Sequence, residues 1–334
     1  MSYYPEPAPT DPKQLAEYIE RELRRIGGEI DAVHDRNILY AEPSRVSDGM
    51  VRIADGSSWN PGSGGGQYLR LNDEWHYMGS GGDTFLNISL GLESGYKMFG
   101  GLGERESMGV VTDGEDIWRG NQLTPAPTSD TSIPVPPDIG EQMTVISEDA
   151  NDTSAGTGVR TVDIHYLDAT GAEQEETVTL NGTTGVDTVA TDIRFVNDMH
   201  SATAGSNGVA EGHIKIYAKS DSGLVYNMIE EGGNKSLVPN RMVPLGKTLV
   251  LQQWRVTETK AKRVAFRIRS TDNEGTLTPG VFCFKDTHYL SGNSSGDISL
   301  VDAIPALSIV KVSGWGDANG GESSCSWWGI LKDD

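Results

Sequence analysis

The feature that most constrains this chain is a series of short alternating segments that begins near residue 139 and continues to residue 334. Apolar and polar residues alternate in Val159–Leu167, further expected strands include Thr248–Val256 and Arg263–Ile268, and turn residues such as Asn181-Gly182 separate such segments. No window with the 3.6-residue period of a helix follows residue 35. The pattern predicts a mainly β protein with β-sandwich or jelly-roll lobes. The length indicates two of them, a β-sandwich over 139–235 and a jelly-roll-like lobe over 236–334.

The N-terminal segment has a different pattern, in which apolar residues recur at steps of three and four. The recurring residues are Ile19, Leu23, Ile26, Ile30 and Val33. They predict an α-helix with Asp11 as its N-cap and Pro12 at its first position. These residues form an apolar seam along one side of the helix. Isoleucine at both seam positions favours a short trimeric coiled coil. The alternative is a single amphipathic helix that packs on the body of its own chain. Gly27-Gly28 would cost about 2 kcal/mol inside a helix. Residues 1–36 are therefore expected to form a flexible arm and a helical attachment or oligomerisation segment.

Residues 37–138 are expected to hold a small β unit and a connector rich in Pro and Gly. Two short alternating runs, 67–71 and 74–78, flank Asn72-Asp73 and predict a hairpin. The expected packing residues of this unit are Trp59, Tyr68, Trp75 and Tyr77. The prolines between 125 and 137 predict an extended connector and a domain boundary near residue 138.

Charge limits the partners of the chain. It has 27 basic and 48 acidic residues, a net charge of −21, so it has no electrostatic reason to bind nucleic acid or an anionic membrane. The polar, Pro-rich N-terminus shows no secretory signal, and no 18-residue apolar run predicts membrane insertion. The sequence predicts a soluble protein that is made in a cytoplasm. Its two cysteines, Cys283 and Cys325, are expected to be buried free thiols.

No catalytic, metal or cofactor motif emerges from the residues. The six histidines are scattered without zinc-ligand spacing, and the glycine run 62–66 continues into Gln67 rather than into a phosphate-binding Lys-Ser/Thr pair. Gly292–Gly296 matches the G-x-S-x-G nucleophile elbow, but no helix pattern follows it. The acidic clusters 148–152 and 113–116 could coordinate calcium or could be solvated turns, and neither has the spacing of a defined calcium loop. The chain is therefore expected to be no enzyme and to hold no cofactor.

Several segments resemble recurring segments of tailed-bacteriophage virion proteins. They include Ile133-Pro-Val-Pro-Pro and the stretches at 140–147, 151–162, 177–184 and 186–196. Tyr18-Ile-Glu-Arg-Glu-Leu is similar to the helical openings of phage fibre and head-associated proteins, and residues 54–66 are similar to the small unit beside such helices. Ser326-Trp-Trp-Gly-Ile-Leu, with 304–312, resembles the last hairpin of phage jelly-roll modules. The resemblance covers about two-thirds of the chain.

The resemblance implies a virion structural protein, trimeric and projecting from the head or tail. We expect a head fibre or decoration protein that is attached to capsid or tail proteins by its N-terminal segment and exposes its β lobes on the virion. Host-surface glycans are an additional expected partner. The candidate sugar-binding residues are Trp254, Trp315, Trp327 and Trp328. Trp327 and Trp328 point to opposite faces of one strand, so at least one should be a core residue. A tail-associated host-recognition protein, a glycan depolymerase and a capsid cement protein are the alternatives.

Overall fold

The computed structural model describes residues 38–39, 41–42, 50–62, 64–71, 74–79, 88–91, 93–110, 114–260, 263–272, 281–291, 294–318 and 320–334. The chain divides into two compact units, Met1–Glu93 and Ser94–Asp334. The predicted helical seam (Ile19, Leu23, Ile26, Ile30 and Val33) lies outside the described residues, so the coiled coil stays a prediction. Within the described part of the chain, no helix is long and apolar enough to cross a membrane.

The first unit contains a four-stranded sheet in the order β1-β2-β3-β4. Its strands are β1 (Ile38–Leu39), β2 (Val51–Ala54), β3 (Gly66–Leu71) and β4 (Glu74–Gly79). The β3–β4 pair confirms the predicted hairpin. Trp59 packs between Tyr68 and Trp75, with ring centroids 6.3 and 5.3 Å away. Three aromatic rings therefore supply most of the core of this small sheet.

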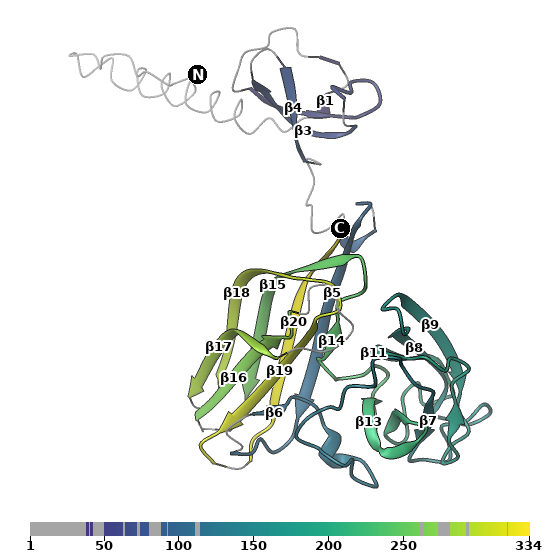
Figure 1. Cartoon of the computed structure of the whole chain (residues 1–334). Coiled ribbons are helices and arrows are strands. Elements are labelled where there is room, and N and C mark those ends of the chain that lie inside the picture. Colours follow the sequence, from purple (N-terminus) through teal and green to yellow (C-terminus); the bar gives the residue numbers. More distant parts are fainter. Residues whose placement is uncertain are drawn as a thin grey trace, which may run out of the picture. The chain divides into compact units, whose positions relative to one another are not determined.

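Nine strands of the second unit, the short β6 (Glu115–Asp116) among them, form two sheets, one of four and one of five strands (Figure 1). One sheet has the order β18-β15-β20-β5 and the other β14-β19-β16-β17. The other eight strands are β5 (Tyr96–Arg105), β14 (Arg241–Met242), β15 (Lys247–Glu258), β16 (Arg263–Ser270), β17 (Cys283–Ser291), β18 (Ser294–Ile304), β19 (Ile309–Gly316) and β20 (Ser323–Asp333). Taken in chain order as strands one to eight, the sheets read 6-3-8-1 and 2-7-4-5. This is the strand order of a jelly roll, two Greek keys folded into a sandwich.

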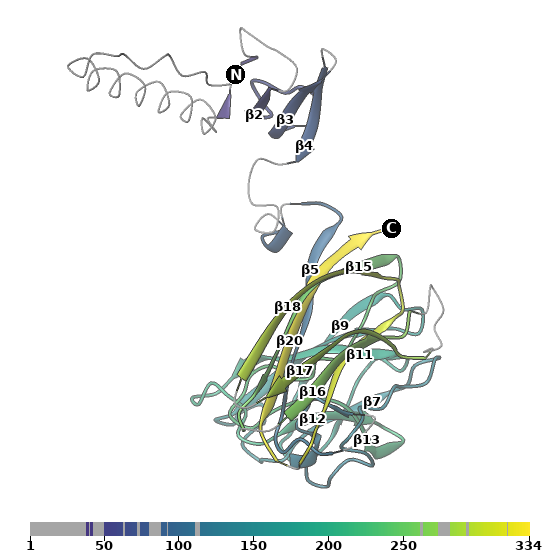
Figure 2. The ribbon, with the colours of Figure 1, turned by 90° about the vertical axis from the view of Figure 1, so that its left-hand side faces the viewer.

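A second β lobe is inserted between the first two strands of the jelly roll. It has one sheet in the order β10-β7-β12-β13 and another in the order β11-β8-β9. The strands are β7 (Met143–Ser147), β8 (Val159–Leu167), β9 (Glu173–Thr179), β10 (Val186–Asp187), β11 (Phe195–Ala204), β12 (Ile214–Ala218) and β13 (Asp221–Ile229). The jelly roll lies beside this lobe in Figure 1 and in front of it in Figure 2. The predicted sandwich over 139–235 corresponds to this lobe.

Each lobe has its own core, which follows from the alternation along its strands. In β16, Val264, Phe266 and Ile268 are buried between the jelly-roll sheets, whereas Arg263 and Arg267 point outward. Burial of large apolar side chains stabilises such a sandwich by about 2 kcal/mol per residue. In the inserted lobe, β8 buries Val162, Ile164 and Tyr166 in the same way. The alternation that predicted the strands therefore also sets the inner face of each sheet.

The predicted division at residue 138 needs correction. β5 lies inside the segment 37–138 but pairs with β20 along its whole length, from Lys332↔Tyr96 to Ser323↔Arg105. The jelly roll therefore needs a strand from outside 236–334. β6 (Glu115–Asp116) pairs with β19, and a 3-10 helix (Gly120–Gln122) follows it. The Pro-rich segment contains no strand, as expected, but it is held against the body, since the buried Arg194 guanidinium donates to the Pro136 carbonyl at 2.8 Å and to Asp138.

Candidate functional site

Two of the four candidate tryptophans are core residues. Trp254 and Trp327 face each other across β15 and β20, and they are 0% and 1% exposed. The Trp254 indole donates to Asp286 at 3.0 Å, and the Trp327 indole donates to the Pro239 carbonyl at 2.9 Å. Neither ring has a free face, so the prediction that these two stack on sugars is wrong. The expectation that Trp327 and Trp328 point to opposite faces is confirmed.

The other two tryptophans, Trp315 and Trp328, are half-buried on the outer faces of the two sheets. The Trp328 indole donates to Gln253 at 3.1 Å, beside a hollow of about 260 Å³ that Arg255 and Ser326 also line. Trp315 lines a second cavity, of about 310 Å³, on the β14-β19-β16-β17 sheet. Only these two of the four tryptophans offer an accessible ring to a ligand.

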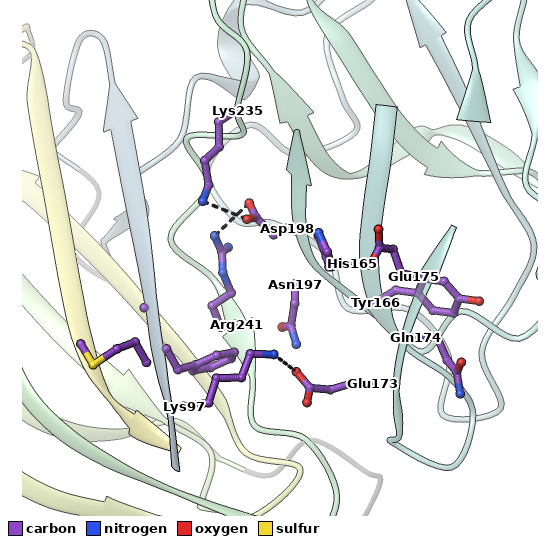
Figure 3. Close-up of a pocket in the computed structure, with 13 residues that line it drawn as sticks. Lys97, His165, Tyr166, Glu173, Gln174, Glu175, Asn197, Asp198, Lys235 and Arg241 are labelled. Atoms are coloured by element: carbon purple, nitrogen blue, oxygen red, sulfur yellow. Dashed lines mark hydrogen bonds and ion pairs between the residues drawn. The ribbon is translucent and has the colours of Figure 1, made fainter. Parts of the chain in front are cut away.

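The larger cleft, of about 580 Å³, lies between β5 of the jelly roll and the β11-β8-β9 sheet of the inserted lobe (Figure 3). Lys235 and Arg241 both contact Asp198, at 3.1 and 3.4 Å. Burial opposes ionisation of the Asp198 carboxyl, but these two cations outweigh it and lower its pKa. Lys97 also reaches across the cleft to Glu173, at 3.0 Å. The charged groups of the cleft therefore hold the two lobes together.

A pair of stacked histidines occupies the same polar sheet face. The rings of His165 and His200 lie 5.2 Å apart at an interplanar angle of 13°. Glu175 stands 3.7 Å from His165, and Asp163 stands 3.6 Å from His200. Throughout the part of the chain that the structure describes, no group of three His, Cys, Asp or Glu side chains could hold a metal ion. This face therefore carries two imidazoles and two carboxylates on three neighbouring strands, β8, β9 and β11.

The two acidic clusters form structural networks. Asp152 is completely buried and accepts hydrogen bonds from the Ser147 hydroxyl and from the amides of Val159, Glu211 and Gly212, so it is not part of a solvated turn. In the second cluster, buried Glu115 pairs with Arg105 at 3.0 Å, and buried Asp116 pairs with Lys311 at 3.0 Å. These carboxylates satisfy backbone and cationic donors, which explains their positions without calcium.

The remaining motif residues also have plain structural roles. Ser294 begins strand β18, so a strand follows the G-x-S-x-G match where a nucleophile elbow requires a helix. Cys325 is buried, and burial raises the pKa of its thiol. Cys283 is exposed, which corrects the expectation that both thiols are buried. Its place at the start of edge strand β17 explains the exposure.

No protein-family model matches the chain, and no curated protein matches it. Among solved structures, the T13 particle of infectious bursal disease virus is 10% identical, with a TM-score of 0.23 over 71% of this chain and 70% of that chain. Isomalto-dextranase of Arthrobacter globiformis T6, complexed with panose, is 11% identical, with a TM-score of 0.20 over 59% of this chain and 33% of that chain. The empty cowpea mosaic virus particle is 7% identical, with a TM-score of 0.17 over 61% of this chain and 84% of that chain. Superpositions of this quality establish no shared fold, so the class, a jelly roll with an inserted β lobe, rests on the strand order.

Proposed function

We propose that this chain is a structural component of a bacteriophage virion, namely a trimeric head fibre or decoration protein. Its N-terminal segment attaches it to capsid proteins, and its β lobes face outward. The observation that carries the proposal is the jelly-roll strand order, an architecture typical of viral capsid and lectin domains. Since a fold alone does not define a function, the resemblance to phage virion proteins supplies the narrower assignment.

The segments that carry the resemblance contribute to strands of both lobes. Residues 140–147 include β7, 151–162 lead into β8, and 186–196 contain β10 and the start of β11. The C-terminal segments contribute to β19 and β20. The resemblance therefore falls on strands that build the body rather than on one surface loop.

Electron microscopy of particles labelled with an antibody against this chain tests the proposal. Label on the heads is the expected result. Label on the tail would favour the alternative of a tail-associated host-recognition protein. Particles without label would overturn a virion role.

Light scattering tests the trimer. We expect a mass of three chains for the full-length protein and of one chain after removal of residues 1–36. A trimer that survives the truncation would move the interface into the β lobes. A monomer in both cases would contradict the coiled coil and leave a cement protein that assembles only on the capsid.

Binding of host-surface glycans is a second function that we propose for the exposed lobes, and accessible aromatic rings favour it. We propose binding without hydrolysis, in line with the sequence, in which no catalytic motif emerges. Release of reducing sugar from a bound polysaccharide would contradict this and would identify a depolymerase.

A further inference from the structure

One cross-strand row on the outer face of the β14-β19-β16-β17 sheet places two aromatic rings on either side of an alanine. Ala265 on β16 is in register with Tyr289 on β17 and with Trp315 on β19. Neighbouring strands lie about 4.8 Å apart, so the two aromatic residues are rooted about 10 Å apart with only a methyl group between them. Tyr289 is 72% exposed and Trp315 is half-buried. The row therefore forms a trough with aromatic walls and an alanine floor.

The cavity of about 310 Å³ coincides with this trough. Its size is at the lower end of the roughly 300–1,000 Å³ that is typical of small-molecule pockets. Leu290, Val264 and Gly316 contribute to the lining, and Arg263, Ser291 and Asp317 add polar groups. Apolar walls with a few polar groups suit a sugar ring, because its C–H face can stack on an aromatic ring while its hydroxyls bind the polar groups.

Arg267 lies next to the trough, against the Trp315 ring that forms one of its walls. It lies two residues beyond Ala265 on the same face of β16, and its guanidinium carbon is 4.1 Å from the centroid of the Phe284 ring and 4.4 Å from that of Trp315. Its Nε is buried without a hydrogen-bond partner, and no carboxylate of the described residues pairs with it. Two aromatic rings therefore hold the guanidinium plane in place through cation–π contacts.

An arginine without a carboxylate partner is unexpected in a chain with 48 acidic and 27 basic residues. Arg267 is half-buried, and even the deeply buried cations of the body have such partners, as Arg105 pairs with Glu115, Arg241 with Asp198 and Lys311 with Asp116. A planar guanidinium favours a carboxylate, which it can bind through two parallel hydrogen bonds. Charge complementarity thus points to a ligand that brings its own carboxylate.

We infer that the trough formed by Tyr289, Ala265 and Trp315, together with Arg267 beside it, binds an acidic sugar, a hexuronic acid unit of a surface polysaccharide. The ring stacks against Trp315 and Tyr289, and its carboxylate pairs with Arg267. This inference rests on the proposed glycan-binding function and names its ligand class and its site. It also replaces Trp254 and Trp327 as candidates by two residues, Tyr289 and Arg267, that the sequence did not single out.

The test is calorimetric titration of the full-length protein with tetragalacturonic acid and with the neutral galactotetraose. Wild type should bind the acidic oligosaccharide at least tenfold more tightly. Arg267→Gln should remove that preference, and Trp315→Ala or Tyr289→Ala should weaken binding of the acidic sugar at least tenfold. Trp328→Ala, on the outer face of the other sheet, is the matched control and should leave binding unchanged. Thermal unfolding of each variant checks the fold, and the exposed Tyr289 keeps the test valid if Trp315→Ala unfolds.

The outcomes separate the site from the function. Binding of either sugar that Arg267→Gln and Tyr289→Ala leave unchanged would overturn the site while glycan binding stands. Loss of binding in Trp328→Ala alone would move the site to the other sheet. If these sugars and a panel of host capsular polysaccharides all fail to bind wild type, the glycan-binding function fails together with the site.

Discussion

Among single residues, the buried Asp152 connects three parts of the inserted lobe. Its carboxylate joins the end of β7, the start of β8 and the loop before β12 through donors at 2.6 to 3.2 Å. Asp152→Ala leaves these donors buried without an acceptor, so we expect the free energy of unfolding to fall by about 3 kcal/mol or more in urea denaturation. Asp192→Ala, at an exposed position, should change it by less than about 0.5 kcal/mol. Equal effects of the two substitutions would contradict the network.

The titration of Glu230 should produce a measurable pH dependence of the free energy of unfolding. Burial raises its pKa from 4.5 to about 7; Arg119, 3.3 Å away, opposes the shift, and Glu104 and Glu106 add to it. The folded protein therefore holds this proton over the window from about pH 4.5 to 7 in which the unfolded chain has lost it, and stability declines as the pH rises through that window.

Glu230→Gln removes this titration. Relative to the variant, wild type should lose up to about 3 kcal/mol of unfolding free energy between pH 4 and pH 8. Denaturation curves of both proteins at several pH values measure the difference. A difference that does not vary with pH would show that Glu230 ionises normally in the fold.

Among the elements, β5 has three glycines, at 100, 101 and 103, that lie directly against backbone atoms of neighbouring segments. A Cβ at Gly101 would stand 2.3 Å from the Pro239 carbonyl oxygen and 2.8 Å from the Trp327 indole nitrogen, the two atoms that share a hydrogen bond. We expect Gly101→Val to lower the free energy of unfolding by about 3 kcal/mol, through overpacking and the lost bond. The adjacent Leu102, 45% exposed, is the control, and Leu102→Val should have little effect in the same urea titration. A Gly101 variant as stable as the control would mean that β5 can shift away from β20.

How well the sequence predicted the structure differs from one strand to another. Strands with clear alternation were predicted within a few residues, since Thr248–Val256 lies in β15 and Arg263–Ile268 lies in β16. β5 was missed because glycines at 100, 101 and 103 are typical of a loop. The strand that pairs with these glycines, β20, lies more than 200 residues further along the chain. Alternation places Trp254 and Trp315 on faces of their strands but does not tell which face is inward. The trough was missed for a related reason, because it can be recognised only when the pairing register of three strands is known.

In the whole molecule, stability depends on how the jelly roll and the inserted lobe are joined. Asp198→Ala leaves Arg241, 4% exposed, without its carboxylate, which typically costs about 3–5 kcal/mol. Calorimetry should then show the body unfolding at a lower temperature and in two transitions. Glu173→Ala breaks the exposed pair with Lys97 across the same cleft and should cost less than about 1 kcal/mol. Similar losses of unfolding free energy in both variants would contradict the conclusion that the buried Asp198–Arg241 pair holds the two lobes together.

The pairing of β5 with β20 determines the order in which parts of the chain can fold during synthesis. About 220 residues separate the two strands along the chain, and ribosomes add roughly 5–20 residues per second. β5 therefore waits roughly 10 to 40 s for its partner, while the inserted lobe, whose strands are local in sequence, can fold in the interval. A chain that stops before β20 keeps an unpaired strand edge and an open core, which are the features that proteases and chaperones recognise. Nascent chains that end early would thus be removed before they could compete for a place in an assembly.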